Sequence, residues 1–327
     1  MNYNKMKKAP VSLFFIIIAA CAFGACNNQK EKKETITTPV TFGDPFIMLY
    51  DDIYYAYGTH APEGIKVYTS KDLKIWTPVP ELALHSKDSW SSEPKNTFWA
   101  PEVYYIKEKN KFFMYYSSSE RICVATADSP LGPFTQTEKK PMIEEEQCID
   151  NSLFIDDDGT PYLYFDRFND GLNIWVAELE NDLTTIKKST MTQCIHVSQP
   201  WEEVWPRVNE GAFVIKHKGI YYLSYSANSY ESPFYGVGYA TATSPMGPWT
   251  KYEDNPILQK PDTLVGVGHG AMFTDKEGKL KFVFHAHQSK EKIHPRLMYI
   301  MDVGFSDDTV PVMKISGEIT QAHFINQ

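Results

Sequence analysis

Short runs of alternating hydrophobic and polar residues cover most of this chain, and one composite pattern occurs five times. Each copy has an apolar run, a polar turn rich in Asp, Gly or Lys, and a second run rich in aromatic residues. The copies begin at Asp44 (DPFIMLYDDIYYAYG), Ala100 (APEVYYIKEKNKFFMYY), Asp150 (DNSLFIDDDGTPYLYF), Glu210 (EGAFVIKHKGIYYLSY) and His269 (HGAMFTDKEGKLKFVFH). Alternating runs joined by short polar turns predict β-hairpins.

The spacing of the copies predicts how the hairpins are organised. They recur about every 50 to 60 residues, a period typical of β-propellers. We therefore expect an all-β, single-domain fold, a five-bladed β-propeller over residues 39–327. The near copies SPLGPF (129–134) and SPMGPW (244–249) support the repeat and are expected to be turns of outer strands. A β-sandwich gives no reason for so long a period, and a β-helix would need much shorter repeats.

Residues 1–25 predict a targeting segment that is not part of the fold. Three lysines precede an apolar run, and the small-residue stretch AFGAC ends at Cys26. This pattern resembles a bacterial lipoprotein signal, in which the cysteine is lipidated, so we expect export and a lipid anchor at Cys26 on a bacterial membrane, the outer membrane, facing the periplasm or the cell surface. An ordinary signal peptide and a membrane anchor helix are the alternatives, although the apolar run is short for a full membrane span. The polar residues 26–38 predict a flexible tether.

Composition and charge narrow the range of partners. The chain has a formal net charge of -9 and no basic stripe, which argues against nucleic acid, because nucleic-acid binding depends on Lys and Arg meeting phosphates. We expect contact with a membrane only through the lipid anchor. Cys123, Cys148 and Cys194 allow at most one disulfide and carry no metal-binding spacing.

The polar residue that opens each copy suggests chemistry. Equivalent positions in propeller blades face one axis, so Asp44, Asp150, Glu210 and His269 are expected to meet in a central pocket. Hydrolysis of a glycosidic bond needs one carboxylic acid to protonate the leaving oxygen and a second carboxylate to activate water or attack the sugar. We assign Glu210 as the acid, Asp150 as the neighbour that keeps it protonated, and Asp44 as the base. Taken singly, each of the three also fits a turn, a cap or a solvated charge.

Five motifs in order give the chain a family resemblance. They are GDPF (43–46), WAPEVYY (99–105), IDNSLFIDDDGTPYLYF (149–165), NEGAFVIKHKGIYYLSYSAN (209–228) and GHGAMF (268–273). Together they resemble glycoside hydrolase family 43, five-bladed propellers that act on arabinosides and xylosides. The resemblance implies an inverting mechanism with Asp44 as general base, Asp150 as pKa modulator and Glu210 as general acid.

The resemblance implies roles for five further residues. It places His269 near a central calcium ion bound largely by water, whereas a histidine held by hydrogen bonds is the alternative; no cofactor is required for the chemistry. Arg296, in HPRLMYI, is expected to contact sugar hydroxyls. Trp99 and Ala100 match the wall of the terminal-sugar pocket, and Ile149 is expected to extend that wall.

These observations lead to a functional prediction. We expect an exo-acting inverting glycosidase that releases a terminal pentose or furanose, α-L-arabinofuranose first, from plant-type polysaccharide or oligosaccharide. A β-D-xylosidase, a β-D-galactofuranosidase and an endo-arabinanase are alternatives on the same scaffold. A non-catalytic surface glycan-binding lipoprotein is an alternative of another class, and a protein-interaction propeller would not need carboxylates at its axis.

Overall fold

The computed structural model describes residues 37–91 and 97–325. The chain divides into two units, Met1–Thr35 and Ile36–Gln327, and all described residues lie in the second. The predicted signal peptide, Cys26 and most of the predicted tether lie outside the described residues. Strand structure begins at Thr37, ahead of the expected start at residue 39. Within the described part of the chain, no helix is long and apolar enough to cross a membrane.

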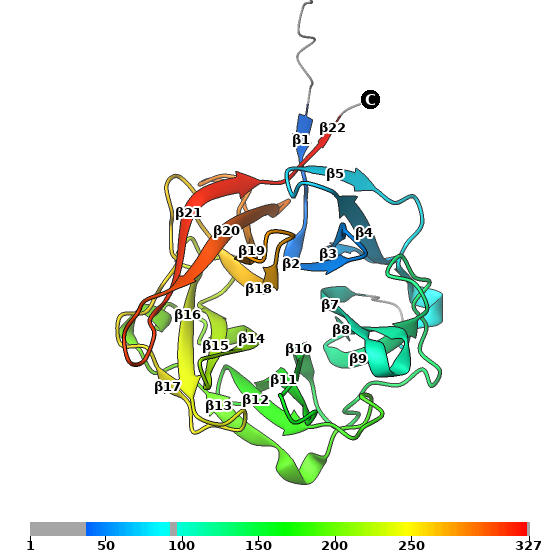
Figure 1. Cartoon of the computed structure of the whole chain (residues 1–327), viewed down its shortest axis with the longest axis horizontal. Coiled ribbons are helices and arrows are strands. Elements are labelled where there is room, and N and C mark those ends of the chain that lie inside the picture. The colour runs from blue at the N-terminus through cyan, green and yellow to red at the C-terminus, as the bar shows by residue number, and fades with distance from the viewer. Residues whose placement is uncertain (1–36, 92–96, 326–327) are drawn as a thin grey trace, which may run out of the picture. The chain divides into compact units, whose positions relative to one another are not determined.

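The fold is the predicted all-β propeller, with five sheets arranged around a common centre (Figure 1). The first sheet contains β1 (Thr37–Pro39), β2 (Gly43–Tyr50), β3 (Ile53–Ala61), β4 (Gly64–Ser70), β5 (Ile75–Pro78), β6 (Leu84–His85) and β22 (His323–Ile325). The second contains β7 (Phe98–Ile106), β8 (Lys111–Ser118) and β9 (Arg121–Ala127). The third contains β10 (Cys148–Ile155), β11 (Pro161–Phe168), β12 (Leu172–Glu178) and β13 (Thr192–Ile195).

The remaining two sheets follow the same antiparallel order. The fourth contains β14 (Asn209–His217), β15 (Ile220–Ala227), β16 (Gly236–Ala242) and β17 (Thr250–Lys251), and the fifth contains β18 (Gly268–Thr274), β19 (Leu280–Ala286), β20 (Leu297–Phe305) and β21 (Met313–Gln321). Short 3-10 turns occur at Ser86–Asp88, Lys107–Lys109, Lys188–Thr190 and Pro200–Glu202. In the first sheet, β22 pairs with β1 and in parallel with β5, so the end of the chain closes the ring.

We call β2, β7, β10, β14 and β18 the first strands of the five sheets, β3, β8, β11, β15 and β19 the second strands, and β4, β9, β12, β16 and β20 the third strands. Tyrosine hydroxyls on four of the second strands tie neighbouring sheets together. Each donates a hydrogen bond to a backbone carbonyl that follows the third strand of the next sheet: Tyr57 to Pro130 (2.6 Å), Tyr115 to Leu183 (2.7 Å), Tyr164 to Pro245 (2.7 Å) and Tyr222 to Pro311 (2.7 Å). Two of the acceptors, Pro130 and Pro245, belong to the repeated SPLGPF and SPMGPW turns. A buried tyrosine needs such a partner, which explains why these turns recur.

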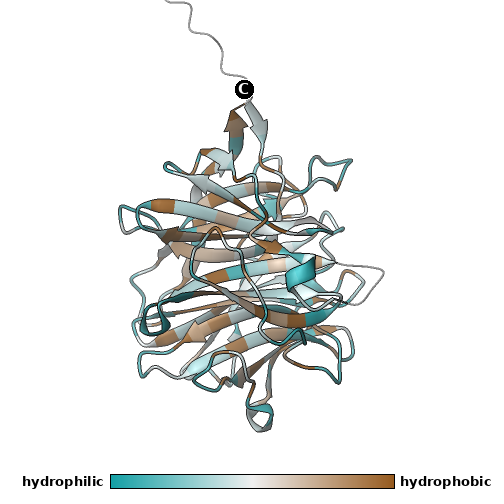
Figure 2. Cartoon of the chain, turned by 90° about the vertical axis from the view of Figure 1, so that its right-hand side faces the viewer, coloured by the Kyte–Doolittle hydropathy of each residue, from teal (hydrophilic) through white to brown (hydrophobic). Residues whose placement is uncertain are grey.

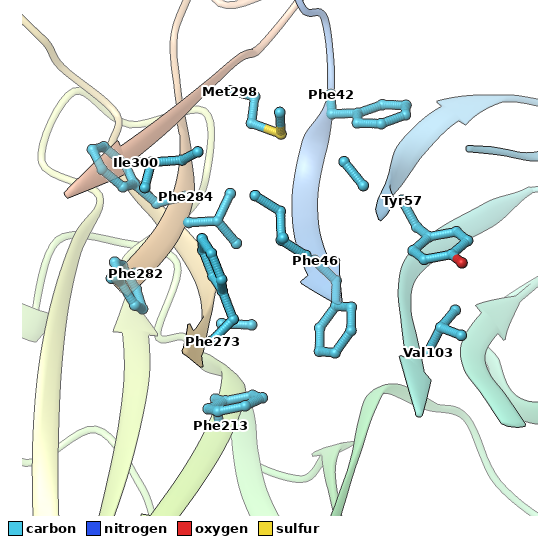
Figure 3. Packing of buried hydrophobic residues seen from close by; sticks show 14 of the residues in the cluster. Phe42, Phe46, Tyr57, Val103, Phe213, Phe273, Phe282, Phe284, Met298 and Ile300 are labelled. Atoms are coloured by element: carbon cyan, nitrogen blue, oxygen red, sulfur yellow. The ribbon is translucent and has the colours of Figure 1, made fainter. Parts of the chain in front are cut away.

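The core lies between the sheets and along the axis. Apolar residues run along the strands, and polar residues gather in the loops (Figure 2). Phe46, Phe213 and Phe273 point toward a shared space from three different sheets (Figure 3), and burial of each phenyl group contributes about 1.5–3 kcal/mol. These three residues and the far ends of the five first strands line an apolar cavity of about 770 Å³. The near ends of the same strands carry the polar residues described next.

Candidate active site

All five first strands contain a β-bulge at the same place. In each sheet the pairing with the second strand shifts by one residue there, and the residue at the bulge has a left-handed backbone conformation. These residues are Asp44 (φ 47°), Ala100 (φ 44°), Asp150 (φ 58°), Gly211 (φ 63°) and His269 (φ 43°). A bulge re-aims side chains and ends regular pairing, so the five strands present this position to the axis in the same way.

This register corrects the predicted position of Glu210 in the repeat. Glu210 does not share the position of Asp44 and Asp150, because Gly211 occupies the bulge in the fourth sheet. Glu210 pairs with Ser226 of β15, as the residues that precede the other bulges pair with their own second strands. A glycine takes the left-handed conformation without the strain that a side chain brings, so the acid stands one residue earlier than the repeated pattern suggested.

A closed ring of hydrogen bonds fixes the five bulges relative to one another. Each bulge N–H donates to a side chain on the second strand of the preceding sheet: Ala100 to Thr59 Oγ1 (3.0 Å), Asp150 to Ser117 Oγ (2.8 Å), Gly211 to Asp166 Oδ2 (3.0 Å), His269 to Ser226 Oγ (2.7 Å) and Asp44 to His285 Nδ1 (3.1 Å). Sequence reasoning missed all five acceptors. Their signal is the polar residue that ends each aromatic run, as in YGT, YYS, YFD, SYS and VFH.

Asp44 is held as a carboxylate. Arg296 binds it through both oxygens, at 2.6 Å to Oδ1 and 3.0 Å to Oδ2, and the Thr59 hydroxyl donates to Oδ2 at 2.5 Å. Burial opposes ionisation, but the charge and hydrogen bonds of Arg296, with His269 at 3.4 Å, outweigh it and hold the pKa of Asp44 well below its usual range. Asp44 can therefore accept a proton only from a strongly activated donor such as attacking water.

The surroundings of Glu210 favour its protonated form. Burial raises its pKa to about 7, the hydrogen bond from Tyr235 (2.6 Å) opposes the rise, and the charge of Asp44 adds to it. Tyr235 directly precedes β16 of the same sheet. A buried carboxyl that keeps its proton near neutral pH can serve as a general acid.

The pKa of Asp150 depends on the charges of both other carboxyl groups, Glu210 and Asp44. Its side chain is 6% exposed, and its Oδ2 is 3.9 Å from His269 Nδ1. Burial, followed by the charges of Glu210 and Asp44, raises the pKa of Asp150 well above its ordinary value. Three carboxyl groups in one buried site cannot all ionise, so each one affects the proton affinity of the others.

Two glycines leave room for the groups that hold the acid and the base. A Cβ atom on Gly43 would lie 2.1 Å from the Arg296 guanidinium, and one on Gly268 would lie 2.4 Å from the Tyr235 ring. Both distances are far shorter than van der Waals contact. Gly43 and Gly268 precede the bulges of their strands, the same position that Glu210 has in β14.

The structure also locates the predicted wall residues. Trp99 and Ile149 precede the bulges of β7 and β10, the position that Glu210 has in β14. Ala100 occupies the bulge itself, where its methyl group leaves open the space that Asp44 and Asp150 fill with carboxyl groups. These positions fit the predicted sugar pocket, whereas contact with a sugar stays a prediction.

Arg296 and His269 both face Asp44. The Arg296 guanidinium is bound to the Asp44 carboxylate. Its contact with sugar hydroxyls stays a prediction. Across residues 37–91 and 97–325, no group of three or more His, Cys, Asp or Glu side chains is arranged to hold a metal ion. Arg296 and Thr59 already engage the Asp44 oxygens, so the side chains do not form a protein-ligated calcium site. The water-bound calcium stays a prediction and enters no step below.

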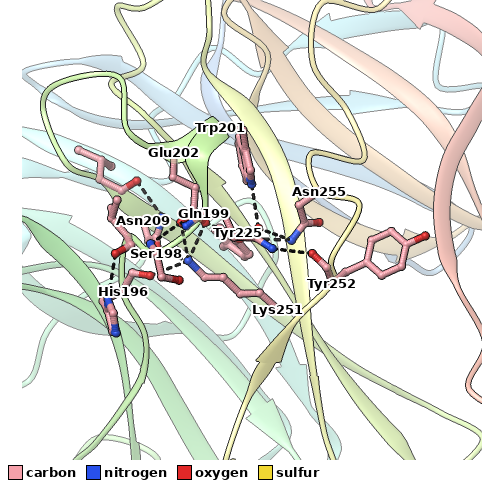
Figure 4. A network of polar contacts seen from close by, with 12 residues as sticks. His196, Ser198, Gln199, Trp201, Glu202, Asn209, Tyr225, Lys251, Tyr252 and Asn255 are labelled. Atoms are coloured by element: carbon pink, nitrogen blue, oxygen red, sulfur yellow. Dashed lines mark hydrogen bonds and ion pairs between the residues drawn. The ribbon is translucent and has the colours of Figure 1, made fainter.

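A buried polar network supports the strand that carries Glu210 (Figure 4). Lys251 Nζ donates to both oxygens of Glu202, at 2.6 and 2.7 Å, and to Asn209 Oδ1 at 2.9 Å. Tyr225 donates to Glu202 Oε1 at 2.6 Å. Glu202 is fully buried and nearly all of the Lys251 side chain is covered, so every charge here depends on its partner. Because Asn209 directly precedes Glu210, this network fixes the start of β14.

Comparisons with known proteins agree with this geometry. The model of glycosyl hydrolases family 43 matches residues 36–311. A crystal structure described as an endo-1,4-β-xylanase from Bacteroides thetaiotaomicron is 48% identical, with a TM-score of 0.84, over 89% of this chain and 100% of that chain. A thermostable family-43 glycoside hydrolase is 37% identical, with a TM-score of 0.78, over 88% of this chain and 97% of that chain.

Curated relatives are more distant and differ in length. A β-D-galactofuranosidase of Aspergillus niger is 28% identical over 76% of this chain and 74% of its own length. An arabinoxylan arabinofuranohydrolase of Bacillus subtilis is 30% identical over 61% of this chain, and the match covers 43% of that protein. The chain thus spans less than half of the arabinofuranohydrolase.

Proposed function

The chain belongs to glycosyl hydrolase family 43 and is therefore an inverting glycoside hydrolase, and from this premise we propose that it removes terminal α-L-arabinofuranose residues from plant-type polysaccharides or oligosaccharides. The observation that carries the proposal is a pair of carboxyl groups in one site, Asp44 bound by Arg296 through both oxygens and Glu210 partly buried with a hydrogen bond from Tyr235. Such a pair matches the base and acid that inversion requires.

The proposed mechanism uses three carboxyl groups. Asp44 removes a proton from a water molecule as that water attacks the anomeric carbon. The bond from that carbon to the leaving oxygen breaks, and Glu210 gives its proton to the leaving oxygen. Asp150, buried beside both, keeps negative charge near Glu210 and so favours the protonated form of the acid. The released sugar has the opposite anomeric configuration.

The exo-acting mode is supported by two relatives that are named exo-α-(1→5)-L-arabinofuranosidases. Arabinofuranose is supported by relatives with arabinofuranohydrolase and exo-α-(1→5)-L-arabinofuranosidase names. β-D-xylosidase, β-D-galactofuranosidase and endo-arabinanase activities remain alternatives on the same scaffold.

A second candidate is cleavage inside a β-1,4-xylan chain. It is favoured by one observation, the 48% identity to the structure described as an endo-1,4-β-xylanase. The two candidates predict different products. Arabinoxylan, arabinan and unsubstituted xylan are digested, and the released sugars are identified by chromatography. We expect monomeric arabinose from the two arabinose-containing substrates and an intact xylan backbone. Xylo-oligosaccharides from unsubstituted xylan would replace the proposal by the second candidate.

The same panel tests catalysis against simple glycan binding. Glu210→Gln should bind the oligosaccharide with wild-type affinity and release almost no sugar. A surface glycan-binding protein would bind equally well in both forms and release nothing in either. Absence of hydrolysis by the wild-type protein on arabinosyl, xylosyl and galactofuranosyl substrates would overturn the proposed function.

We also propose that the five sheets are the five blades of one propeller and that the protein is exported and lipid-anchored at Cys26. Export is supported by the leader pattern and by relatives in Streptomyces avermitilis and Cellvibrio japonicus that are named extracellular. Cells given a labelled fatty acid should incorporate it into the wild-type protein and not into Cys26→Ala. Equal labelling of both would contradict the anchor.

A further inference from the structure

We propose that Asp166 is a positioning residue that acts as a neutral carboxylic acid and donates a hydrogen bond to the carboxylate of Asp150. The inference deepens the proposed function, on which it rests, because it assigns the group that holds the pKa modulator in place. Asp166 lies on β11, in a fully buried position beside the site, and it belongs to none of the motifs that pointed to catalysis.

The position of Asp166 in the hydrogen-bonded ring is the first observation. At the equivalent place the other four sheets have the acceptors Thr59, Ser117, Ser226 and His285, of which three are hydroxyls and the fourth accepts through an unprotonated ring nitrogen. The ring therefore takes one acceptor from each sheet, and in these four sheets the acceptor is a neutral group. Asp166 supplies it with Oδ2, which accepts the Gly211 N–H at 3.0 Å.

The second observation is the other oxygen of Asp166. Oδ1 is buried and meets no N–H or O–H donor among the described residues. A buried carboxylate oxygen without a donor costs about 1–3 kcal/mol or more, whereas a protonated oxygen becomes a donor itself. The neighbouring acidic side chain is that of Asp150, because Asp166 pairs with Ile149 at the bulge of β10, and Asp150 can accept such a hydrogen bond. One proton between the two groups satisfies both.

The charges around Asp166 favour the same state. Asp150 of β10 and Glu210 of β14 are acidic, and the thiols Cys148 and Cys194 on β10 and β13 are neutral because burial raises their pKa values. The cation of the site, Arg296, is bound to Asp44 instead. Burial first, and then the charges of Asp150 and Glu210, raise the pKa of Asp166 well above its ordinary value.

The direction of the hydrogen bond follows. Oδ2 of Asp166 already accepts the Gly211 N–H and Oδ1 is the oxygen without a donor, so the proton is placed on Oδ1 and Asp150 is the acceptor. This hydrogen bond favours the ionised form of Asp150, against the burial and charges that raise its pKa, and negative charge on Asp150 helps to keep Glu210 protonated. Because Gly211 directly follows Glu210, Asp166 also links the modulator to the strand of the acid.

The test compares two variants of one side chain. Asp166→Asn keeps the shape, an oxygen for the Gly211 N–H and a neutral donor for Asp150, whereas Asp166→Leu keeps the approximate size and neither group. For Asp166→Asn we expect kcat/KM within about threefold of wild type and an unchanged high-pH limb of the rate profile. For Asp166→Leu we expect kcat to fall by about 10- to 100-fold, a part of what a positioned acid contributes, with the limb moved to lower pH.

In Asp166→Leu the high-pH limb of the rate profile should move to lower pH for the following reason. Without the donor, Asp150 takes up a proton more readily, less negative charge stands near Glu210, and the pKa of Glu210 falls. If Asp166 were ionised in the wild type, Asp166→Asn would remove that negative charge and lower the limb as well. A limb moved to lower pH by one unit or more in Asp166→Asn would therefore overturn the proposal.

A second measurement does not depend on activity. The infrared difference spectrum between wild type and Asp166→Asn at pH 7 should contain the C=O stretch of a neutral carboxylic acid, present only in the wild type. A carboxylate band in its place would overturn the proposal, even if Asp166→Leu does not fold. This readout also separates the two proposals, because it can succeed in a protein that releases none of the tested sugars.

Discussion

At the scale of single residues, partners rather than residue type decide which carboxyl group acts as acid. Asp44 is buried and Glu210 is half-buried, yet Asp44 has an arginine on both oxygens, whereas Glu210 accepts a hydrogen bond from a tyrosine hydroxyl. A guanidinium at hydrogen-bond distance outweighs the cost of burying one charge. The two pKa values are therefore pushed apart within one site, as acid–base catalysis at neutral pH requires.

This separation predicts the pH dependence of catalysis. Activity should fall as the pH rises through about 7, because Glu210 loses its proton there, and the low-pH limb should lie below the ordinary range of an aspartate, because Asp44 stays ionised. Tyr235→Phe removes a hydrogen bond that favours ionised Glu210, so the high-pH limb should move to higher pH. Tyr252→Phe, which removes an exposed hydroxyl bound to Asp254, is the matched control. A downward shift in Tyr235→Phe would contradict the assignment of Glu210.

A glycine beside the base allows a second prediction at this scale. In Gly43→Ala the new methyl group would collide with the Arg296 guanidinium, so Arg296 must leave Asp44. We expect kcat/KM to fall at least about tenfold, a loss of about 1.4 kcal/mol in transition-state stabilisation. Gly304→Ala, which adds a methyl group to open space, should leave kcat/KM unchanged. Equal activity of Gly43→Ala and wild type would show that Arg296 does not need its observed position.

Some of these residue-scale features could be predicted from sequence and others could not. Asp44, Asp150 and Glu210 stand in recognisable motifs, and Arg296 was expected in the site. The pairing of Arg296 with Asp44 joins residues 252 positions apart, and no local pattern records it. The one-residue offset of Glu210 was missed because the bulge leaves the alternation of the strand intact on either side.

At the scale of elements, the strands of each sheet could be predicted from local sequence, whereas the contacts between sheets could not. The alternating runs and polar turns predicted the first two strands of every sheet. The bonds between sheets, such as Tyr57 to Pro130 and the ring at the bulges, join elements that touch only after the sheets assemble. The buried pair Glu202 and Lys251 belongs to this second kind, because the pair and its partners Asn209 and Tyr225 come from four separate segments.

That buried pair should matter for stability. Lys251→Met or Glu202→Gln should each lower the free energy of unfolding by about 3–5 kcal/mol, because a buried charge loses its partner. Lys188→Met removes an exposed ion pair with Glu145 and should cost less than about 1 kcal/mol. Chemical denaturation monitored by circular dichroism measures all three. Similar midpoints for Lys251→Met and Lys188→Met would show that the network does not stabilise the fold.

At the scale of the whole molecule, closure of the ring brings distant segments to one site. Asp44 belongs to the first sheet and Arg296 precedes the last strands of the fifth, and the two meet because β22 joins the first sheet. The period of the sequence predicted this architecture. It did not predict that β1 and β22 would extend the first sheet, since neither short segment has an alternating pattern of its own.

The central claim is that ring closure makes Glu210 the proton donor to the leaving group. The most direct measurement is the ratio of kcat/KM between wild type and Glu210→Gln on two arabinofuranosides, a natural oligosaccharide and a dinitrophenyl glycoside. We predict a loss of about 10²- to 10⁴-fold on the oligosaccharide, whose leaving oxygen needs a proton, and a much smaller loss on the dinitrophenyl glycoside, whose leaving group departs without one. Equal losses on both substrates would contradict the account.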